Sequence, residues 1–109
     1  MLYFKNLPET PQKLADLIEI KKGRVISMNL SQQESCRMML IAVSAGEDIT
    51  AEQYPGDTLY YVLEGVMPLV RDGIKKEMNI GDVAVVPRDV PHAIGGEGDF
   101  KILQIILTD

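Results

Sequence analysis

The sequence is poor in the residues that build covalent and metal cross-links. Its 109 residues include one cysteine, one histidine and no tryptophan. The single Cys36 excludes a disulfide within the chain and favours a reducing compartment. The single His92 excludes a metal site made of three histidines from one chain.

Basic charge is also scarce. The chain has 11 lysines and arginines against 16 acidic residues, for a net charge of -5. Its longest basic runs are the pairs Lys21-Lys22 and Lys75-Lys76. Nucleic acids and anionic membrane surfaces both require a basic face. We therefore expect neither a nucleic-acid partner nor a membrane partner.

Long apolar runs are missing as well. No segment approaches the roughly 18 apolar residues that cross a bilayer, and the N-terminal stretch MLYFKNLPET has no signal-peptide pattern. We expect a cytoplasmic protein. The length is that of one domain, spanning residues 1–109.

The chain consists mainly of short apolar runs separated by turn residues. Thr10 and Pro11 predict a short helical or irregular segment that reaches Leu17. The apolar runs that follow predict about ten strands, at residues 17–20, 24–30, 36–43, 49–54, 58–65, 66–71, 74–79, 82–87, 92–95 and 100–107. Asp72-Gly73 is a typical hairpin turn. This pattern indicates an all-β sandwich or closed barrel.

Several predicted strands are apolar on both faces. In residues 58–63 neither alternating set of side chains is polar, and residues 38–43 and 102–107 behave in the same way. A strand with one face in water should alternate. Something must therefore cover an outer face of the sheet. We expect a second copy of the chain, giving a homodimer; the alternative is that the N-terminal segment folds over this face.

Two glycine-bounded motifs occupy about residues 46–65 and 81–96. Their spacing, with Pro87 and His92 in register in the second, resembles the small single-domain cupins (the cupin 2 conserved barrel family). The resemblance implies a double-stranded β-helix, or jelly-roll barrel, whose interior carries the functional site. Folds of this kind host many functions, so the site must be judged from its own residues.

The metal-binding positions of the first motif are degenerate. Cupins usually bind a divalent metal through two histidines and a glutamate of the first motif and one histidine of the second. The matching positions here hold Glu52, Tyr54, Thr58 and His92. By this resemblance, His92, Glu52 and Asp57 are the candidate ligands of a weakly held Mn, Fe, Zn or Ni ion.

The same residues also suggest chemistry without a metal. A carboxylate such as Glu52 can orient the His92 ring, with Tyr60 or Tyr54 as an acid or hydrogen-bond partner. This arrangement resembles that of the family's metal-free sugar epimerases. The candidate catalytic residues are thus His92, Glu52 and Tyr60. The predicted ligand pocket consists of Glu52, Tyr54, Thr58, Tyr60 and His92.

The sequence is compatible with three functions. The first is the binding of a small polar molecule in the barrel pocket around His92. The second is catalysis, by a metal-dependent oxygenase or isomerase or by a metal-free epimerase-like enzyme. The third is a structural barrel without chemistry, in which His92 hydrogen-bonds the backbone and the tyrosines only pack.

Overall fold

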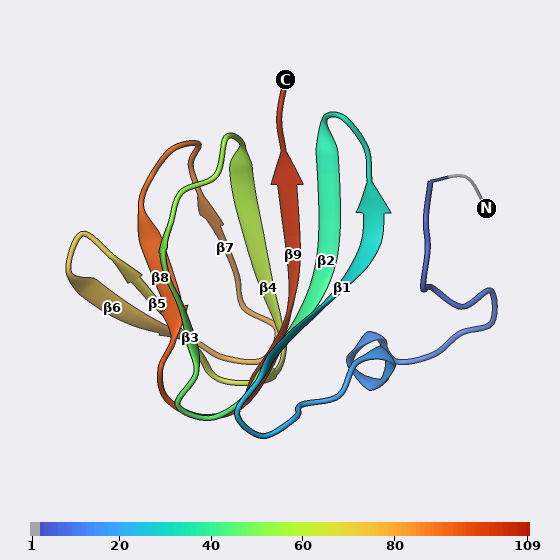
Figure 1. Ribbon diagram of the computed structural model, residues 1–109, viewed down its shortest axis with the longest axis horizontal. Helices are drawn as coiled ribbons and strands as arrows, with labels where there is room; N and C mark the ends of the chain where they lie inside the picture. Colours follow the sequence, from blue (N-terminus) through green and yellow to red (C-terminus); the bar gives the residue numbers. More distant parts are fainter. Residues whose placement is uncertain (1–2) are drawn as a thin grey trace.

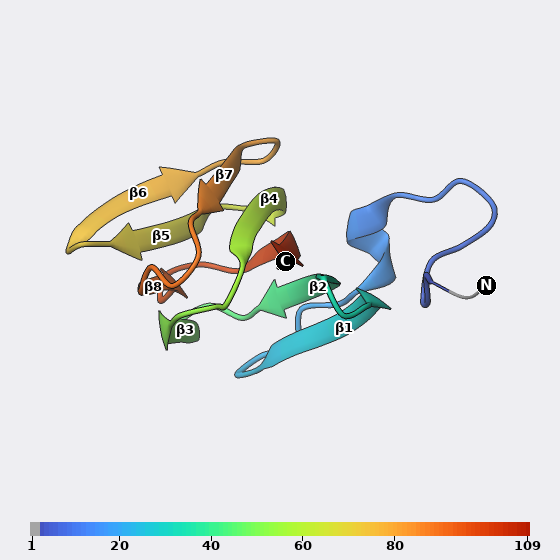
Figure 2. The same ribbon diagram turned by 90° about the horizontal axis from the view of Figure 1, so that it is seen from above.

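The computed structural model describes residues 3–109, which form two antiparallel sheets packed face to face (Figures 1 and 2). One sheet has the strand order β1-β2-β9-β4-β7 and the other has the order β3-β8-β5-β6. The strands are β1 (Val25–Gln32), β2 (Cys36–Val43), β3 (Asp48–Glu52), β4 (Asp57–Gly65), β5 (Met67–Arg71), β6 (Ile74–Met78), β7 (Val83–Val86), β8 (His92–Gly95) and β9 (Phe100–Leu107). The predicted all-β jelly roll is confirmed.

Local turn chemistry sets the strand boundaries. Asp72 and Gly73 connect β5 to β6 with φ of 54° and 73°, as a two-residue hairpin turn requires. This turn fixes the register, in which Arg71 pairs with Ile74 and Leu69 with Lys76. The side chains at alternate positions of both strands therefore face the second sheet.

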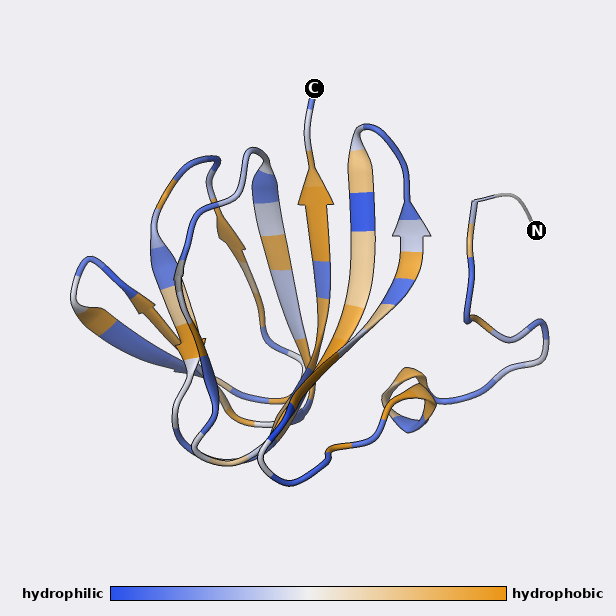
Figure 3. Cartoon of the chain, in the orientation of Figure 1, coloured by the Kyte–Doolittle hydropathy of each residue, from blue (hydrophilic) through white to orange (hydrophobic). Residues whose placement is uncertain are grey.

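The space between the sheets holds the main core. Apolar residues from both sheets fill it, and they include Ile41, Val62, Met67, Ile94 and Phe100. The central strands β2 and β9 are mostly hydrophobic, whereas β6 is largely hydrophilic (Figure 3). The β5–β6 hairpin is thus the more polar end of the sandwich.

The N-terminal segment differs from the sequence prediction. The expected helix from Thr10 is only a 3-10 turn, η1 (Leu14–Leu17), and Lys13 at its N-cap makes no side-chain capping bond. The predicted strand at residues 17–20 is absent. Ile18 is instead 4% exposed and packs against Leu40 and other residues of a second core. Packing onto the sheet, rather than pairing with it, buries the apolar residues of this segment.

This segment covers part of the outer face of the larger sheet. Leu14 and Leu17 pack against the same buried cluster as Leu63 of β4 and Leu103 of β9. Farther along the same face, Tyr61, Val83 and Val85 remain 38%, 58% and 53% exposed. The N-terminal segment therefore accounts for part of the two-sided apolar pattern, and the part of the face at Tyr61 and β7 is left open.

Within the described residues, no helix has the length and apolar character needed to span a membrane.

Candidate functional site

A chain of polar side chains crosses the apolar interior. The hydroxyl of Tyr60 on β4 lies 2.7 Å from Nε2 of His92 on β8, which joins the two sheets. Nε2 of Gln104 on β9 donates to the Tyr60 hydroxyl at 3.3 Å. Tyr60, Gln104 and His92 are 1%, 2% and 5% exposed. These three side chains hydrogen-bond one another in a core that is mostly apolar.

The backbone sets the orientation of the imidazole. Nδ1 of His92 lies 3.0 Å from the carbonyl oxygen of Val90, which can only accept a hydrogen bond. Nδ1 therefore carries a proton, and in the neutral ring Nε2 accepts the proton of the Tyr60 hydroxyl. The hydrogen bonds run from Gln104 to Tyr60 to His92, and from His92 to Val90.

A bulge in β3 brings two further polar residues to this interior. Ile49 pairs with Ile94 but Glu52 pairs with His92, so β3 has one more residue than β8 over this stretch. Ile49 faces the core, and regular alternation from it would point Glu52 outward. The extra residue reverses this alternation and places Glu52 beside His92, while the Tyr54 ring lies 5.8 Å from the imidazole.

Burial changes the acidity of both tyrosines. Desolvation is the main cause that raises the pKa of Tyr60 above 10.0, and the nearby Tyr54 and Glu52 raise it further. Desolvation also raises the pKa of Tyr54, and the Glu52 carboxylate adds to this effect. Gln104 opposes both shifts by hydrogen bonding. Both phenols remain protonated donors at neutral pH.

Comparison with known proteins identifies the family. The cupin domain model matches residues 39–107, and these include every strand that contributes to the polar chain. The chain belongs to the cupin family. No curated protein matches this sequence.

Similar solved structures agree with this assignment. A cupin superfamily protein from Desulfitobacterium hafniense DCB-2 is 43% identical, with a TM-score of 0.93 over 97% of this chain and 98% of its own. A conserved protein of unknown function from Streptococcus pyogenes is 22% identical, with a TM-score of 0.94 over 100% and 96% of the two chains. A salicylate 1,2-dioxygenase variant from Pseudoaminobacter salicylatoxidans is 21% identical over 75% of this chain and 26% of its own, with a TM-score of 0.69. The last two show the shared fold alone.

The side chains of this cupin do not suit a metal ion. Within residues 3–109, no group of three or more His, Cys, Asp or Glu side chains could hold one. Both nitrogens of His92 already have hydrogen-bond partners. Asp57 is exposed, and its Oδ1 accepts a hydrogen bond from the backbone of Arg88 at 2.8 Å. The structure therefore brings Glu52 to His92 but does not bring Asp57 to them.

The other predicted pocket residues have different roles. Thr58 is buried on the same strand face as Tyr60, and its hydroxyl donates to the carbonyl of Gly56 at 3.4 Å.

Glu52 and Tyr54 are only partly buried, so they form the outer part of the site. No hydrogen bond joins Glu52 to His92 in the described chain; the Val90 carbonyl orients the ring instead.

Two residues of the candidate site were missed by the sequence analysis. Gln104 interrupts the apolar run of β9, and this interruption was the available signal. Arg37 on β2 pairs with Ile106, which in turn pairs with Thr58, so all three lie in one row. Arg37 and Ile106 also line a rim pocket of about 350 Å³, which Glu52, Tyr54, Tyr60 and His92 do not line. The positive charge of Arg37 acts on Tyr54 and lowers its pKa, against the dominant effect of burial.

Proposed function

We propose that this cupin binds a small polar organic molecule at the mouth of its barrel, without requiring a metal ion. The observation that carries the proposal is the 2.7 Å hydrogen bond between Tyr60 and His92 inside an apolar core. Buried polar groups are costly unless they are fully paired, and here they are: the described residues contain no buried side-chain N or O atom without a partner. The network therefore forms a rigid polar floor.

The partly exposed residues above this floor supply the contacts for a ligand. Glu52 offers a carboxylate, Tyr54 a protonated phenol and Arg37 a guanidinium. Arg37 also lines a pocket of about 350 Å³, a volume at the low end of the size range of small-molecule sites. Glu52 and Tyr54 do not line this pocket, so it can receive only the part of a ligand that reaches Arg37. A neutral or zwitterionic molecule with several hydroxyl or amine groups matches this mixture of donors and acceptors.

Catalysis is the second candidate function, and the same pair of residues favours it. The Tyr60 hydroxyl is a donor, and Nε2 of His92 is an acceptor at 2.7 Å. Such a pair can relay a proton to or from a bound substrate. A metal-dependent oxygenase or isomerase has less support, because the ligand set is incomplete.

A homodimer is a further part of the proposal. The open outer face of β4 and β7 presents Tyr61, Val83 and Val85, which are apolar and more than a third exposed. A two-fold interface places the same patch of both copies in contact, and an uncharged patch is compatible with itself. A second copy would cover the part of the sheet that the N-terminal segment leaves exposed.

The experiment for the ligand site is an NMR titration of the isotope-labelled protein with a panel of sugars, polyols and amino acids. We expect at least one member to shift the backbone amides of Tyr54 and His92 saturably. Glu52→Gln and Tyr54→Phe should weaken that binding, while Tyr61→Phe on the outer face of β4 should leave it unchanged. If the panel shifts no amide at the mouth, or if the two mouth variants bind as the wild type does, binding at the mouth is excluded.

A further inference from the structure

A second pocket opens between the sheets on the side where both of them end. β6 is the last strand of one sheet and β7 is the last strand of the other. Between them lies a pocket of about 320 Å³. Its lining consists of Leu69, Arg71, Asp72, Ile74, Lys76, Ala84 and Val85. Neither His92 nor Tyr60 lines this pocket, so it is distinct from the barrel mouth.

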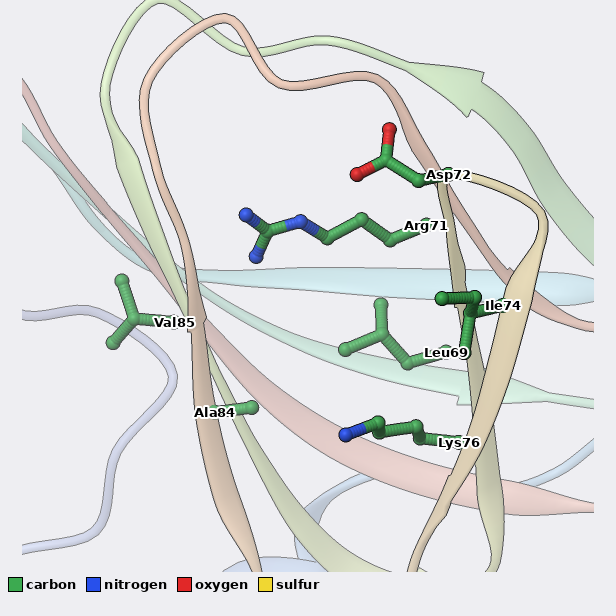
Figure 4. Close-up of a pocket in the computed structure, with 7 residues that line it drawn as sticks. All are labelled: Leu69, Arg71, Asp72, Ile74, Lys76, Ala84 and Val85. Atoms are coloured by element: carbon green, nitrogen blue, oxygen red, sulfur yellow. The ribbon is translucent and has the colours of Figure 1, made fainter.

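Two cations extend into this pocket from the β5–β6 hairpin. Figure 4 shows Arg71 and Lys76 on either side of Leu69, both extending toward the strand that carries Ala84. The register explains why Lys76 points inward. It pairs with Leu69, and paired residues of neighbouring strands have their side chains on the same face of the sheet. Leu69 packs against the core between the sheets. Lys75, the neighbour of Lys76, faces the other way and forms an ion pair with Glu97.

These cations are not neutralised by the surrounding protein. The ion pairs of the described chain involve Lys75, Arg88 and Lys101, and none involves Arg71 or Lys76. Acidic residues outnumber basic ones in this chain, which has a net charge of -5, yet these two cations form no ion pair among the described residues. Asp72 is the carboxylate among the lining residues, and it is an exposed residue of the hairpin turn. The pocket therefore combines an aliphatic wall with positive charge at its opening.

We propose that the pocket between β6 and β7 binds a small organic carboxylate, with the anionic group between Arg71 and Lys76 and the apolar body on Leu69, Ile74 and Ala84. A guanidinium matches the planar geometry of a carboxylate and can bind both of its oxygens. The ammonium of Lys76 adds a second charge-assisted hydrogen bond. Leu69 and Ala84 provide the apolar surface that favours a carboxylate with a hydrocarbon body over a small inorganic anion.

An inward-facing lysine on an edge strand has a competing explanation. Charged residues, and lysine in particular, prevent edge strands from pairing with other chains. In that case Lys76 would protect β6 against association and would not bind a ligand. The two explanations predict different effects of the same substitution, so one set of variants separates them.

The experiment is an NMR titration of the full chain with three probes: benzoate, benzyl alcohol and acetate. We expect benzoate to shift the amides of Leu69, Arg71 and Ala84 saturably. Benzyl alcohol lacks the charge and acetate lacks the apolar body, so each should bind at least about tenfold more weakly, as the loss of one strong contact implies. Equal binding of benzoate and benzyl alcohol, or no saturable shift with benzoate, would overturn the proposal.

Matched variants sharpen this test. Arg71→Gln and Lys76→Gln should each weaken benzoate binding about tenfold, whereas Lys75→Gln, on the opposite face of β6, should not change it. Asp72→Asn should tighten binding because it removes a negative charge and keeps a residue that tolerates positive φ. If Lys76→Gln causes association in light scattering and leaves benzoate affinity unchanged, the edge-protection explanation is correct and the carboxylate site is excluded. Tyr54→Phe at the barrel mouth should leave benzoate binding intact, so this proposal and the proposed function can fail separately.

Discussion

The hydroxyl of Tyr60 and Nε2 of His92 lie 2.7 Å apart and form a hydrogen bond between the two sheets of the sandwich. Tyr60 is fixed by its pairing with Gln104 on β9, and His92 by its hydrogen bond to the Val90 carbonyl. His92 stands at a metal-binding position of the cupin motifs, and in this structure its Nε2 is engaged by the Tyr60 hydroxyl. The effects of this polar contact on stability and on titration can be measured without knowing the ligand.

Removing the Tyr60 hydroxyl should destabilise the protein. In Tyr60→Phe, Nε2 of His92 and the amide of Gln104 both lose a buried partner. Leaving such groups unpaired costs about 1–3 kcal/mol in the free energy of unfolding. Urea denaturation of the two proteins measures the difference.

Tyr61→Phe is the matched control for this prediction. Tyr61 is the next residue of β4, lies on the outer face and is 38% exposed. Its loss of a hydroxyl should change stability by no more than about 0.5 kcal/mol. Equal effects of the two substitutions would mean that the buried hydrogen bond contributes no measurable stability.

The raised pKa of Tyr60 predicts a loss of stability at alkaline pH. In the unfolded chain the phenol ionises near its ordinary pKa of 10.0, whereas the folded protein holds the proton to higher pH. Above pH 10 the folded state therefore binds more protons than the unfolded state, and stability falls as pH rises. Each group of this kind lowers the free energy of unfolding by up to about 1.4 kcal/mol per pH unit. Unfolding free energies measured from pH 8 to pH 12 should fall less steeply for Tyr60→Phe than for the wild type. If the two free energies fall in parallel, the pKa of Tyr60 is not raised in the folded protein.

The sequence predicted the framework better than the site. The Asp72-Gly73 hairpin and the glycines of both motifs follow local backbone rules, so their positions were predictable. The orientation of Glu52 depends on a bulge in β3, and the interior role of Gln104 depends on which strands pair with β9. The residues at 17–20 have the pattern of a strand but pack as a cover, because tertiary contacts outweigh local propensity there.

The untagged protein should contain transition metal well below one equivalent. His92 has no free nitrogen, and Asp57 is held by the backbone of Arg88. Metal analysis by mass spectrometry, after incubation with manganese, iron, nickel or zinc, checks this. His92→Ala should leave the small metal content unchanged. If the wild type holds about one equivalent of metal and the variant loses it, the hypothesis of a metal-dependent oxygenase or isomerase is supported instead.

The open face of β4 and β7 should mediate dimer formation. Sedimentation velocity should show a dimer for the wild type. It should show a monomer for Val83→Lys, because Val83 is 58% exposed on this face and a charge buried there would be unpaired. Ile80→Lys changes a residue of similar exposure, 66%, in the turn before β7, and should stay dimeric. A monomeric wild type would show that this face is open to solvent.

Gly65, at the end of the first motif, should tolerate no side chain. Its φ is 74°, and a Cβ placed there would clash with the backbone carbonyl oxygen of Asp99. Gly46 begins the same motif with φ of 83°, but a Cβ there meets no atom within 4 Å. Gly46→Ala should therefore cost only the backbone strain of about 1–2 kcal/mol, and Gly65→Ala should cost clearly more because β4 must also separate from the residues before β9. Thermal unfolding of the two variants measures this difference in stability. Equal melting temperatures would show that the backbone near Asp99 can shift to accept the Cβ without losing stability.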